Sequence, residues 1–199
     1  MITMRKICIV LVFAVVAATV THAGPFGLDM GMSLRQIEEL TGKTPIAVGA
    51  DYMVTPPKPH PVFEKYVVSV SPTVGLYVII ALGNDIESSS FGTQLKDAFE
   101  NVRTQLQGIY GEPKVYDFLE YKSIWNETNE WMMALSRKER HLTAFWKREY
   151  GSVLPDSIDG IMLDAKASNS SKGYLVLRYE FSNFQEGAAE KKEKQSSVF

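Results

Sequence analysis

Apolar residues recur at helical spacing between Ser33 and Gly42, where Leu34, Ile37 and Leu40 form one stripe. Serine is a good N-cap, and the glutamine three residues later completes a capping box. A glycine after the last apolar residue supplies the left-handed conformation that commonly ends a helix. Residues 33–42 are therefore predicted to form a short amphipathic helix that packs on another element.

A second amphipathic helix is predicted over residues 93–110. Its stripe consists of Leu95, Phe99, Val102, Leu106 and Ile109. The helix is followed by Gly-Glu-Pro at 111–113, much as the first is followed by Gly-Lys-Thr-Pro at 42–45. Glycine and proline at these offsets are typical helix stops.

Strand-like segments follow each helix. Alternating or continuous apolar patterns mark residues 52–55, 66–71 and 76–82 after the first helix, and 142–148, 158–167 and 174–181 after the second. Residues 169–173 (NSSKG) have the composition of a hairpin turn. The prediction is an α+β fold, an antiparallel sheet with helices packed mainly on one face, built from two helix-then-strands repeats.

Two irregular stretches interrupt this pattern. Residues 55–61 (TPPKPHP) contain four prolines and are predicted to be a stiff connection. Residues 118–141 contain two of the three tryptophans, and within them a helix is predicted over 127–140 with a basic end. Residues 24–184 are predicted to form one domain, and the charged residues 185–199 a frayed or disordered tail.

The first 23 residues have the pattern of a signal peptide. Arg5 and Lys6 precede an uncharged, mostly apolar run over 7–20, and Thr21-His22-Ala23 resembles a leader-peptidase site with cleavage after Ala23. The alternative is a membrane anchor, but the run is shorter than the roughly 17–25 residues that a spanning helix needs. We therefore expect an exported protein, periplasmic or secreted.

Cys8 is the only cysteine, and it lies inside the apolar run. A lipoprotein needs its acylated cysteine at the new N-terminus, so no lipid anchor is expected in the mature chain. No second apolar run of spanning length follows residue 20, so no transmembrane segment is expected there either. Cleavage would remove Cys8 together with any possibility of disulfides or thiolate ligands. An exported chain held by its core alone suits the bacterial periplasm.

Composition and motifs limit the kinds of partner and catalytic site that the sequence supports. The full chain has a net charge of −2, and loss of Arg5 and Lys6 makes it more negative, so no nucleic-acid partner is expected. The sequence contains no HExxH, G-x-S-x-G, P-loop or G-x-G-x-x-G motif. No catalytic residue, metal ligand or cofactor is therefore assigned.

The opening "GMS..QIEELTG..P" and the helix ending "L..IYGEP" resemble segments of small exported bacterial proteins of the beta-lactamase-inhibitor-protein and SmpA/OmlA type. The resemblance implies helices stacked on an antiparallel sheet of helix-then-strands repeats, and a function in binding other proteins. The chain departs from the SmpA/OmlA pattern because it lacks the lipid-bearing cysteine.

Three sets of residues are candidates for binding. Arg137, Arg140 and His141 lie near a predicted helix end and could bind a carboxylate or phosphate, or could simply be a solvated helix end. Trp125 and Trp131 could line a sugar- or peptide-binding cleft, or pack in the core. His60, within the proline-rich stretch, could dock into a partner, or belong to a rigid spacer.

The function expected from these features is a non-catalytic binding or protein-interaction module whose partner is an envelope protein or a cell-wall component. One alternative is an envelope-directed hydrolase that uses His141 and carboxylate pairs such as Asp85 with Glu87 or Asp117 with Glu120. The other is an immunity-type inhibitor that neutralises a toxin. An enzyme would need His141 or a carboxylate pair to converge with Arg137 or Arg140 in one pocket.

Overall fold

The computed structural model describes residues 24–196, apart from the side chain at position 195. The predicted signal peptide, its cleavage site and Cys8 lie outside the described residues. The described part is an α+β fold whose strands form one antiparallel sheet.

The strands of the sheet are β1 (Ile46–Val48), β2 (Asp51–Val54), β3 (Phe63–Ser71), β4 (Gly75–Gly83), β5 (Ile86–Glu87), β6 (Lys114–Leu119), β7 (Arg140–Lys147), β8 (Ile158–Ala167) and β9 (Lys172–Phe181). The α-helices are α1 (Leu34–Thr41), α2 (Thr93–Tyr110), α3 (Trp131–Ser136) and α4 (Phe184–Ser196), and short 3-10 turns are η1 (Pro25–Gly27), η2 (Thr128–Glu130) and η3 (Arg148–Tyr150).

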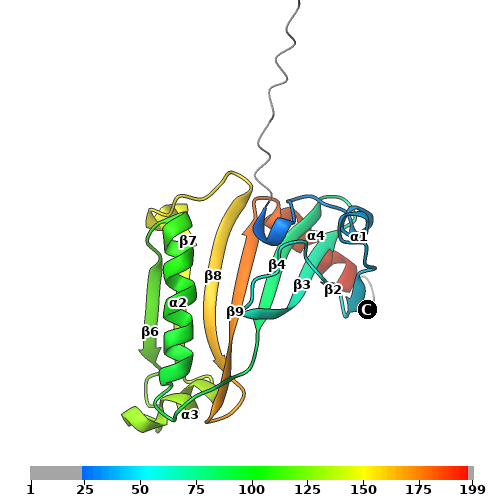
Figure 1. The fold of residues 1–199 in the computed structure, drawn as a ribbon. Coiled ribbons are helices and arrows are strands. Elements are labelled where there is room, and N and C mark those ends of the chain that lie inside the picture. Colours follow the sequence, from blue (N-terminus) through cyan, green and yellow to red (C-terminus); the bar gives the residue numbers. More distant parts are fainter. Residues whose placement is uncertain (1–23, 197–199) are drawn as a thin grey trace, which may run out of the picture.

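The sheet consists of two four-stranded meanders, β1–β4 and β6–β9. They join at a central seam, where β4 pairs with β9. The strand order is β1-β2-β3-β4-β9-β8-β7-β6, and the short β5 pairs with the beginning of β9 (Figure 1). The last strand of each meander, β4 or β9, meets the other in antiparallel register. The predicted repeat is confirmed in outline, because α1 precedes one meander and α2 precedes the other. Each unit has four main strands instead of three.

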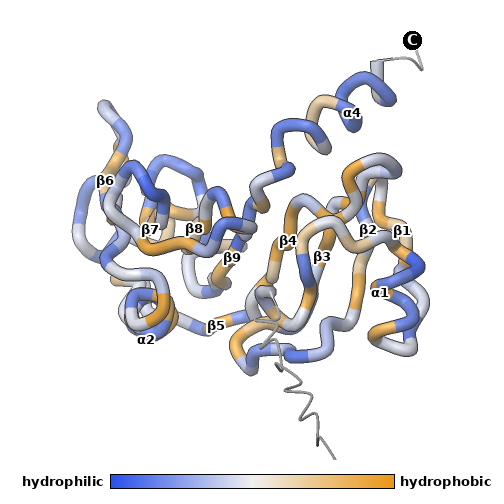
Figure 2. Tube along the Cα trace, turned by 90° about the horizontal axis from the view of Figure 1, so that it is seen from above, coloured by the Kyte–Doolittle hydropathy of each residue, from blue (hydrophilic) through white to orange (hydrophobic). Residues whose placement is uncertain are grey.

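Helices α1 and α2 lie on one side of the sheet and α4 lies on the other (Figure 2). Helix α3 contacts β7 and β8 and contributes Trp131 and Met132 to the same core as α2. The core between the first three helices and the sheet includes Ile37, Phe99, Trp131 and Trp146. This arrangement confirms the prediction that the helices pack mainly on one face.

The predicted helical stripes differ from the structure at their last positions. Leu40 is 48% exposed and Ile109 is 67% exposed. A helix advances 3.6 residues per turn, so the inward position after Ile37 falls on Thr41, and the one after Leu106 falls on Tyr110. Both of these side chains are partly buried.

Residues 185–196 belong to α4, which differs from the predicted frayed tail. The helix is anchored at its start by Asn183, whose side-chain amide donates to the backbone carbonyls of Val74 and Leu76 at 2.9 and 3.1 Å. Farther along, Lys191 Nζ lies 2.6 Å from Asp51 Oδ1. Close packing of Phe184 and Gly187 on Tyr77, together with polar contacts to the sheet, orders a helix that has no apolar stripe to reveal it in the sequence.

Candidate functional site

The candidate site is the face of β6–β9 opposite α2 and α3, hereafter the open face. Helix α4 meets this face at β9, where Arg178 Cζ lies 5.5 Å from the ring centroid of Phe184. Side chains alternate between the two faces of a strand, and cross-strand partners share a face. Because Ala144 and Trp146 point into the core, the neighbouring odd-numbered side chains of β7 point to the other side. The register then gives the members of the open face: Lys114, Tyr116, Phe118, His141, Thr143, Phe145, Lys147, Met162, Asp164, Lys166, Val176, Arg178 and Glu180.

Aromatic side chains line the outer part of the open face. Phe118 stacks on the His141 ring at a centroid distance of 4.8 Å, and Tyr116 meets Phe145 edge-on at 5.8 Å. Phe118 is nevertheless 45% exposed. Large apolar rings held partly in solvent on a rigid sheet mark an interaction surface more often than a structural requirement.

The open face contains two adjoining shallow hollows. One, of about 410 Å³, is lined by Tyr116, Phe118, His141 and Phe145 among others. The next, of about 390 Å³, extends over Met162 to Arg178 and Glu180. Phe145 and Lys147 line both hollows, so the two form one shallow trough across β6–β9.

The charges on the open face are unevenly matched. Lys166 Nζ lies 2.5 Å from Asp164 Oδ2, and Arg178 Nε lies 2.8 Å from Glu180 Oε1. Lys114 and Lys147, by contrast, form no ion pair with any of the described residues. The Lys114 ammonium lies over the ring of Tyr116 at 5.3 Å, and its hydrogen bond to that residue raises the pKa of Lys114. The trough is therefore aromatic, with a cationic rim.

A larger hollow of about 780 Å³ lies between α1, α4 and the turns of the first meander. Its charged groups already have partners within the chain. Arg35 pairs with Glu39 at 2.8 Å, and Lys191 pairs with Asp51. Hydrogen bonds from the Ser71 and Thr73 hydroxyls lower the pKa of Glu190. This hollow thus offers less unsatisfied recognition chemistry than the open face.

The two tryptophans predicted as binding residues do not form a cleft. Trp131 is only 4% exposed. Its ring packs against Gly92 and lies under the Lys96 ammonium at 4.4 Å, so it is a core residue of α3. Trp125 is half-buried in the loop that follows β6, where its backbone N–H donates to the Ser123 hydroxyl at 3.2 Å.

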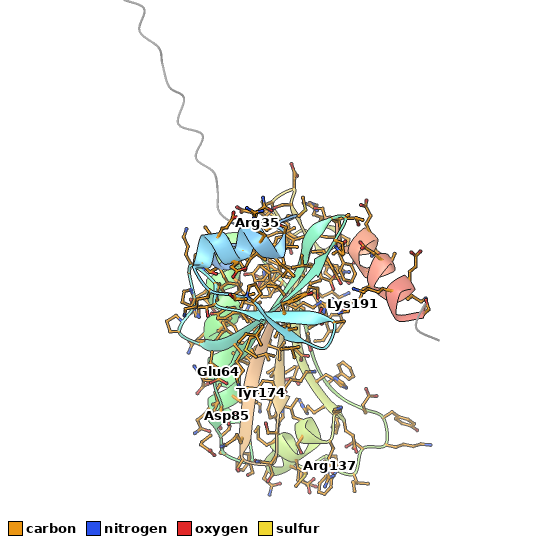
Figure 3. All side chains as sticks on the ribbon, turned by 90° about the vertical axis from the view of Figure 1, so that its right-hand side faces the viewer. Arg35, Glu64, Asp85, Arg137, Tyr174 and Lys191 are labelled. Atoms are coloured by element: carbon orange, nitrogen blue, oxygen red, sulfur yellow. The ribbon has the colours of Figure 1, made fainter. Side chains whose placement is uncertain are left out.

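The three basic candidates are not brought together. The helix predicted over 127–140 is replaced by η2 and α3, and Lys138 adopts a left-handed φ of 62° that ends the helical segment before β7. Arg137 is exposed at the end of α3, before β7 begins (Figure 3). Arg140 and His141 are consecutive residues of a strand and therefore lie on opposite faces of the sheet.

Each of these side chains has its own partner. Arg140 donates from Nη2 and Nε to Asp117 Oδ1 at 2.6 and 3.1 Å on the helix-covered face. His141 Nε2 lies 3.1 Å from Glu120 Oε1 on the open face. His60 is in a separate region, with Nε2 3.2 Å from Gln105 Oε1, and is part of a packed connection.

The carboxylate pairs considered for acid–base chemistry are also accounted for by local contacts. Asp85 and Glu87 both approach Lys172, at 3.5 and 3.1 Å. Asp117 and Glu120 point to opposite faces of the sheet, as their partners show. Within residues 24–196 no group of three or more acidic, histidine or cysteine side chains could hold a metal ion. A hydrolase would need His141 or a carboxylate pair to meet Arg137 or Arg140 in one pocket. Asp117 alone pairs with Arg140, and the hollow beside His141 is lined by no arginine, so this convergence is not found among the described residues.

Tyr116, Phe118, Phe145 and Lys147 are the site residues that the sequence prediction did not select. A signal for them is present, because an aromatic or cationic residue occupies every second position of 114–118, and 145 and 147 continue that pattern on β7. Alternation shows that such residues share a face, but it does not show whether helices cover that face.

The helices within residues 24–196 are too short or too polar to cross a bilayer. Comparison of the chain with protein-family models, with curated proteins and with solved structures yields no significant match.

Proposed function

We propose that the protein is an exported, non-catalytic binding protein that holds an acidic protein surface on its open face. The observation that carries this proposal is the uncovered aromatic trough bordered by Lys114 and Lys147. The wide, shallow shape of the trough suits a protein surface better than a small molecule, which usually binds in a deeper cleft.

The chemistry of the open face supports an acidic partner with an apolar centre. Aromatic side chains lose little conformational entropy on contact and supply most of the binding energy in many interfaces. Lysines without intramolecular carboxylate partners attract a surface of opposite charge and speed its association. Because the trough lies on hydrogen-bonded strands, its shape is fixed before the partner arrives, which reduces the entropic cost of binding.

A photocrosslinking amino acid at position 118 should capture the partner in the envelope fraction of the native host. The matched control carries the same crosslinker at position 109, which is also well exposed but lies on the outer side of α2. We expect one stoichiometric adduct from position 118 and none from position 109. A toxin in that adduct would identify the protein as an immunity-type inhibitor. Equal labelling from both positions would argue against the open face.

Charge reversal then tests the rim directly with the purified partner. The double variant Lys114→Glu/Lys147→Glu should weaken binding by about tenfold or more in calorimetry, and more at low salt, because two attractive contacts become repulsive. Lys43→Glu/Lys58→Glu makes the same change in net charge at exposed positions of the first half and should leave affinity within about twofold. Equal effects of the two double variants would contradict an acidic partner at the open face.

Export is the second part of the proposal, and the sequence of residues 1–23 supports it. The protein recovered from the periplasmic fraction should begin at Gly24, as determined by intact mass and N-terminal sequencing. The variant Ala23→Arg, which removes the small residue from the cleavage site, should leave the leader attached. Recovery of wild-type protein that retains Met1 and remains in the cytoplasm would overturn this part.

The duplicated helix-then-meander layout is also in keeping with the resemblance to beta-lactamase-inhibitor-type proteins.

A further inference from the structure

Strand β6 forms one edge of the sheet and is paired with β7 alone (Figure 1). A bond from Glu120 N to Glu139 O at 2.7 Å extends the ladder by one position, so residue 120 directs its backbone groups toward β7. In an antiparallel pair this orientation alternates. The N–H and C=O groups of Val115, Asp117 and Leu119 therefore point away from the sheet, toward a free edge.

The sequence of this edge is chemically self-complementary. Residues 114–120 read Lys-Val-Tyr-Asp-Phe-Leu-Glu. When the segment is laid antiparallel to itself about its central aspartate, lysine faces glutamate, valine faces leucine and tyrosine faces phenylalanine. Opposite-charge, apolar and aromatic pairs of this kind are the combinations that stabilise adjacent strands.

We propose that the protein forms a twofold symmetric dimer in which β6 of one copy pairs antiparallel with β6 of a second copy, centred on Asp117. Asp117 would pair with its own equivalent, and Val115 with Leu119 of the other copy. All three are residues whose backbone groups point outward, so each facing pair can exchange both of its hydrogen bonds. The open faces of the two copies would then continue into each other. The free edge of β6 supports this proposal separately from the proposed function, but Lys114 and Phe118 belong to both surfaces. A self-adduct between two copies from the crosslinker at position 118 would therefore report the dimer and not the partner.

Complementarity selects this register over its neighbours. A pairing centred on Val115 would place Pro113, which has no N–H, opposite Asp117. A pairing centred on Leu119 would place Phe118 opposite Glu120, and one centred on Tyr116 would place Val115 opposite Asp117. Each of these alternatives loses the Lys114–Glu120 match. Identical patches that face each other across a twofold axis are the usual form of a homodimer interface.

The central pair of aspartates is compatible with the dimer because each carboxylate is already paired. Asp117 Oδ1 accepts two hydrogen bonds from its own Arg140, at 2.6 and 3.1 Å. At the twofold axis, the Asp117–Arg140 pair of one copy would meet the same pair of the other copy, so that positive and negative charges would alternate. On the open face, Lys114 of one copy would approach Glu120 of the other, whose side chain is 54% exposed and remains accessible beside His141.

Sedimentation equilibrium of the full chain tests the dimer and its edge. Val115→Pro removes one outward N–H that the strand itself does not use, a change that edge strands tolerate. It should raise the dimer dissociation constant by about tenfold or more, whereas Val115→Ala, which keeps the N–H, should raise it by less than about threefold. Circular dichroism serves to show that both variants retain the fold. A wild-type protein that stays monomeric at all concentrations, or a Val115→Pro variant that dimerises normally, would overturn the proposal.

Two further variants test the register. Lys114→Glu should weaken the dimer, and Lys114→Glu/Glu120→Lys should restore it, because the swap preserves the match between copies. In a Cys8→Ser background, Asp117→Cys should form a disulfide-linked dimer on oxidation, since facing residues bring their Cα atoms within disulfide range. Val115→Cys alone should not. Failure of the charge-swap rescue, or equal crosslinking from both cysteine positions, would contradict the pairing about Asp117.

Discussion

Replacement of Trp146 by alanine should lower the free energy of unfolding by about 3–5 kcal/mol. The indole of Trp146 is fully buried in the core between β7 and the helices. Its Nε1 donates to the carbonyl of Gly111 at 2.9 Å and so ties β7 to the end of α2. The substitution removes this bond and leaves a cavity that close-packed neighbours refill only in part.

Urea unfolding followed by circular dichroism measures this loss, and two controls divide it. Trp146→Phe keeps an aromatic ring but leaves the Gly111 carbonyl without its donor, so about 1–3 kcal/mol of the loss should remain. Trp125→Ala changes the same residue type in a half-buried loop and should cost less than half as much as Trp146→Ala. A similar cost at positions 125 and 146 would show that the core is not organised around Trp146.

Gly92→Ala is the second change with a large expected effect. Gly92 has a left-handed φ of 76°, and a Cβ placed there would lie 2.1 Å from Cε3 of Trp131. The left-handed backbone should cost about 1–2 kcal/mol for alanine, and overpacking against the buried ring a further 1–3 kcal/mol or so. The total loss should therefore be about 2–5 kcal/mol by urea unfolding.

Gly42 provides the matched control, because its φ is 65° and nothing lies within 4 Å of a Cβ built there. Gly42→Ala should show the backbone cost alone, about 1–2 kcal/mol. A double-mutant cycle of Gly92→Ala with Trp131→Ala should recover the packing part of the loss, since the clashing ring is then absent. Equal costs at Gly42 and Gly92, or no coupling in the cycle, would contradict the close contact between Gly92 and Trp131.

The parts of the fold that could be predicted from sequence are those whose stability is local. The capping box at Ser33 is present in the structure, with the Ser33 hydroxyl accepting from Gln36 N, and α2 has the predicted bounds of Thr93 and Tyr110. The alternating pattern of β9 is also present, whereas in β8 it is interrupted by Asp164, which is buried. In each case one side chain period or one cap determines the outcome without reference to distant residues.

The missed elements depend on partners elsewhere in the chain. Strand β6 lies at an edge, and its two faces carry both polar and apolar residues, so no clean alternation between dry and wet positions marks it. Helix α4 is held by Asn183 and by polar contacts of Glu190 and Lys191 with the sheet. Such contacts leave no periodic signal in the sequence.

The candidate site was only partly predictable for the same reason. Tyr116 and Phe118 alternate with other residues along β6, which the sequence shows, but their joint exposure depends on which face α2 and α3 cover. Arg140 and His141 were expected near one helix end, and the left-handed Lys138 instead starts a strand that separates them. Because β7 follows directly, the side chains of Arg140 and His141 lie on opposite faces of the sheet and cannot bind one ligand together.

The seam between β4 and β9 has a consequence for how the chain folds. Strand β9 is the last strand in the sequence, yet it lies in the middle of the sheet between β4 and β8. Contacts such as Val78 with Glu180 join residues that are far apart in the chain, and such non-local pairing slows folding. The seam can therefore form only once β9 is available, and until then β4 has an unpaired edge of the kind that can pair with another chain.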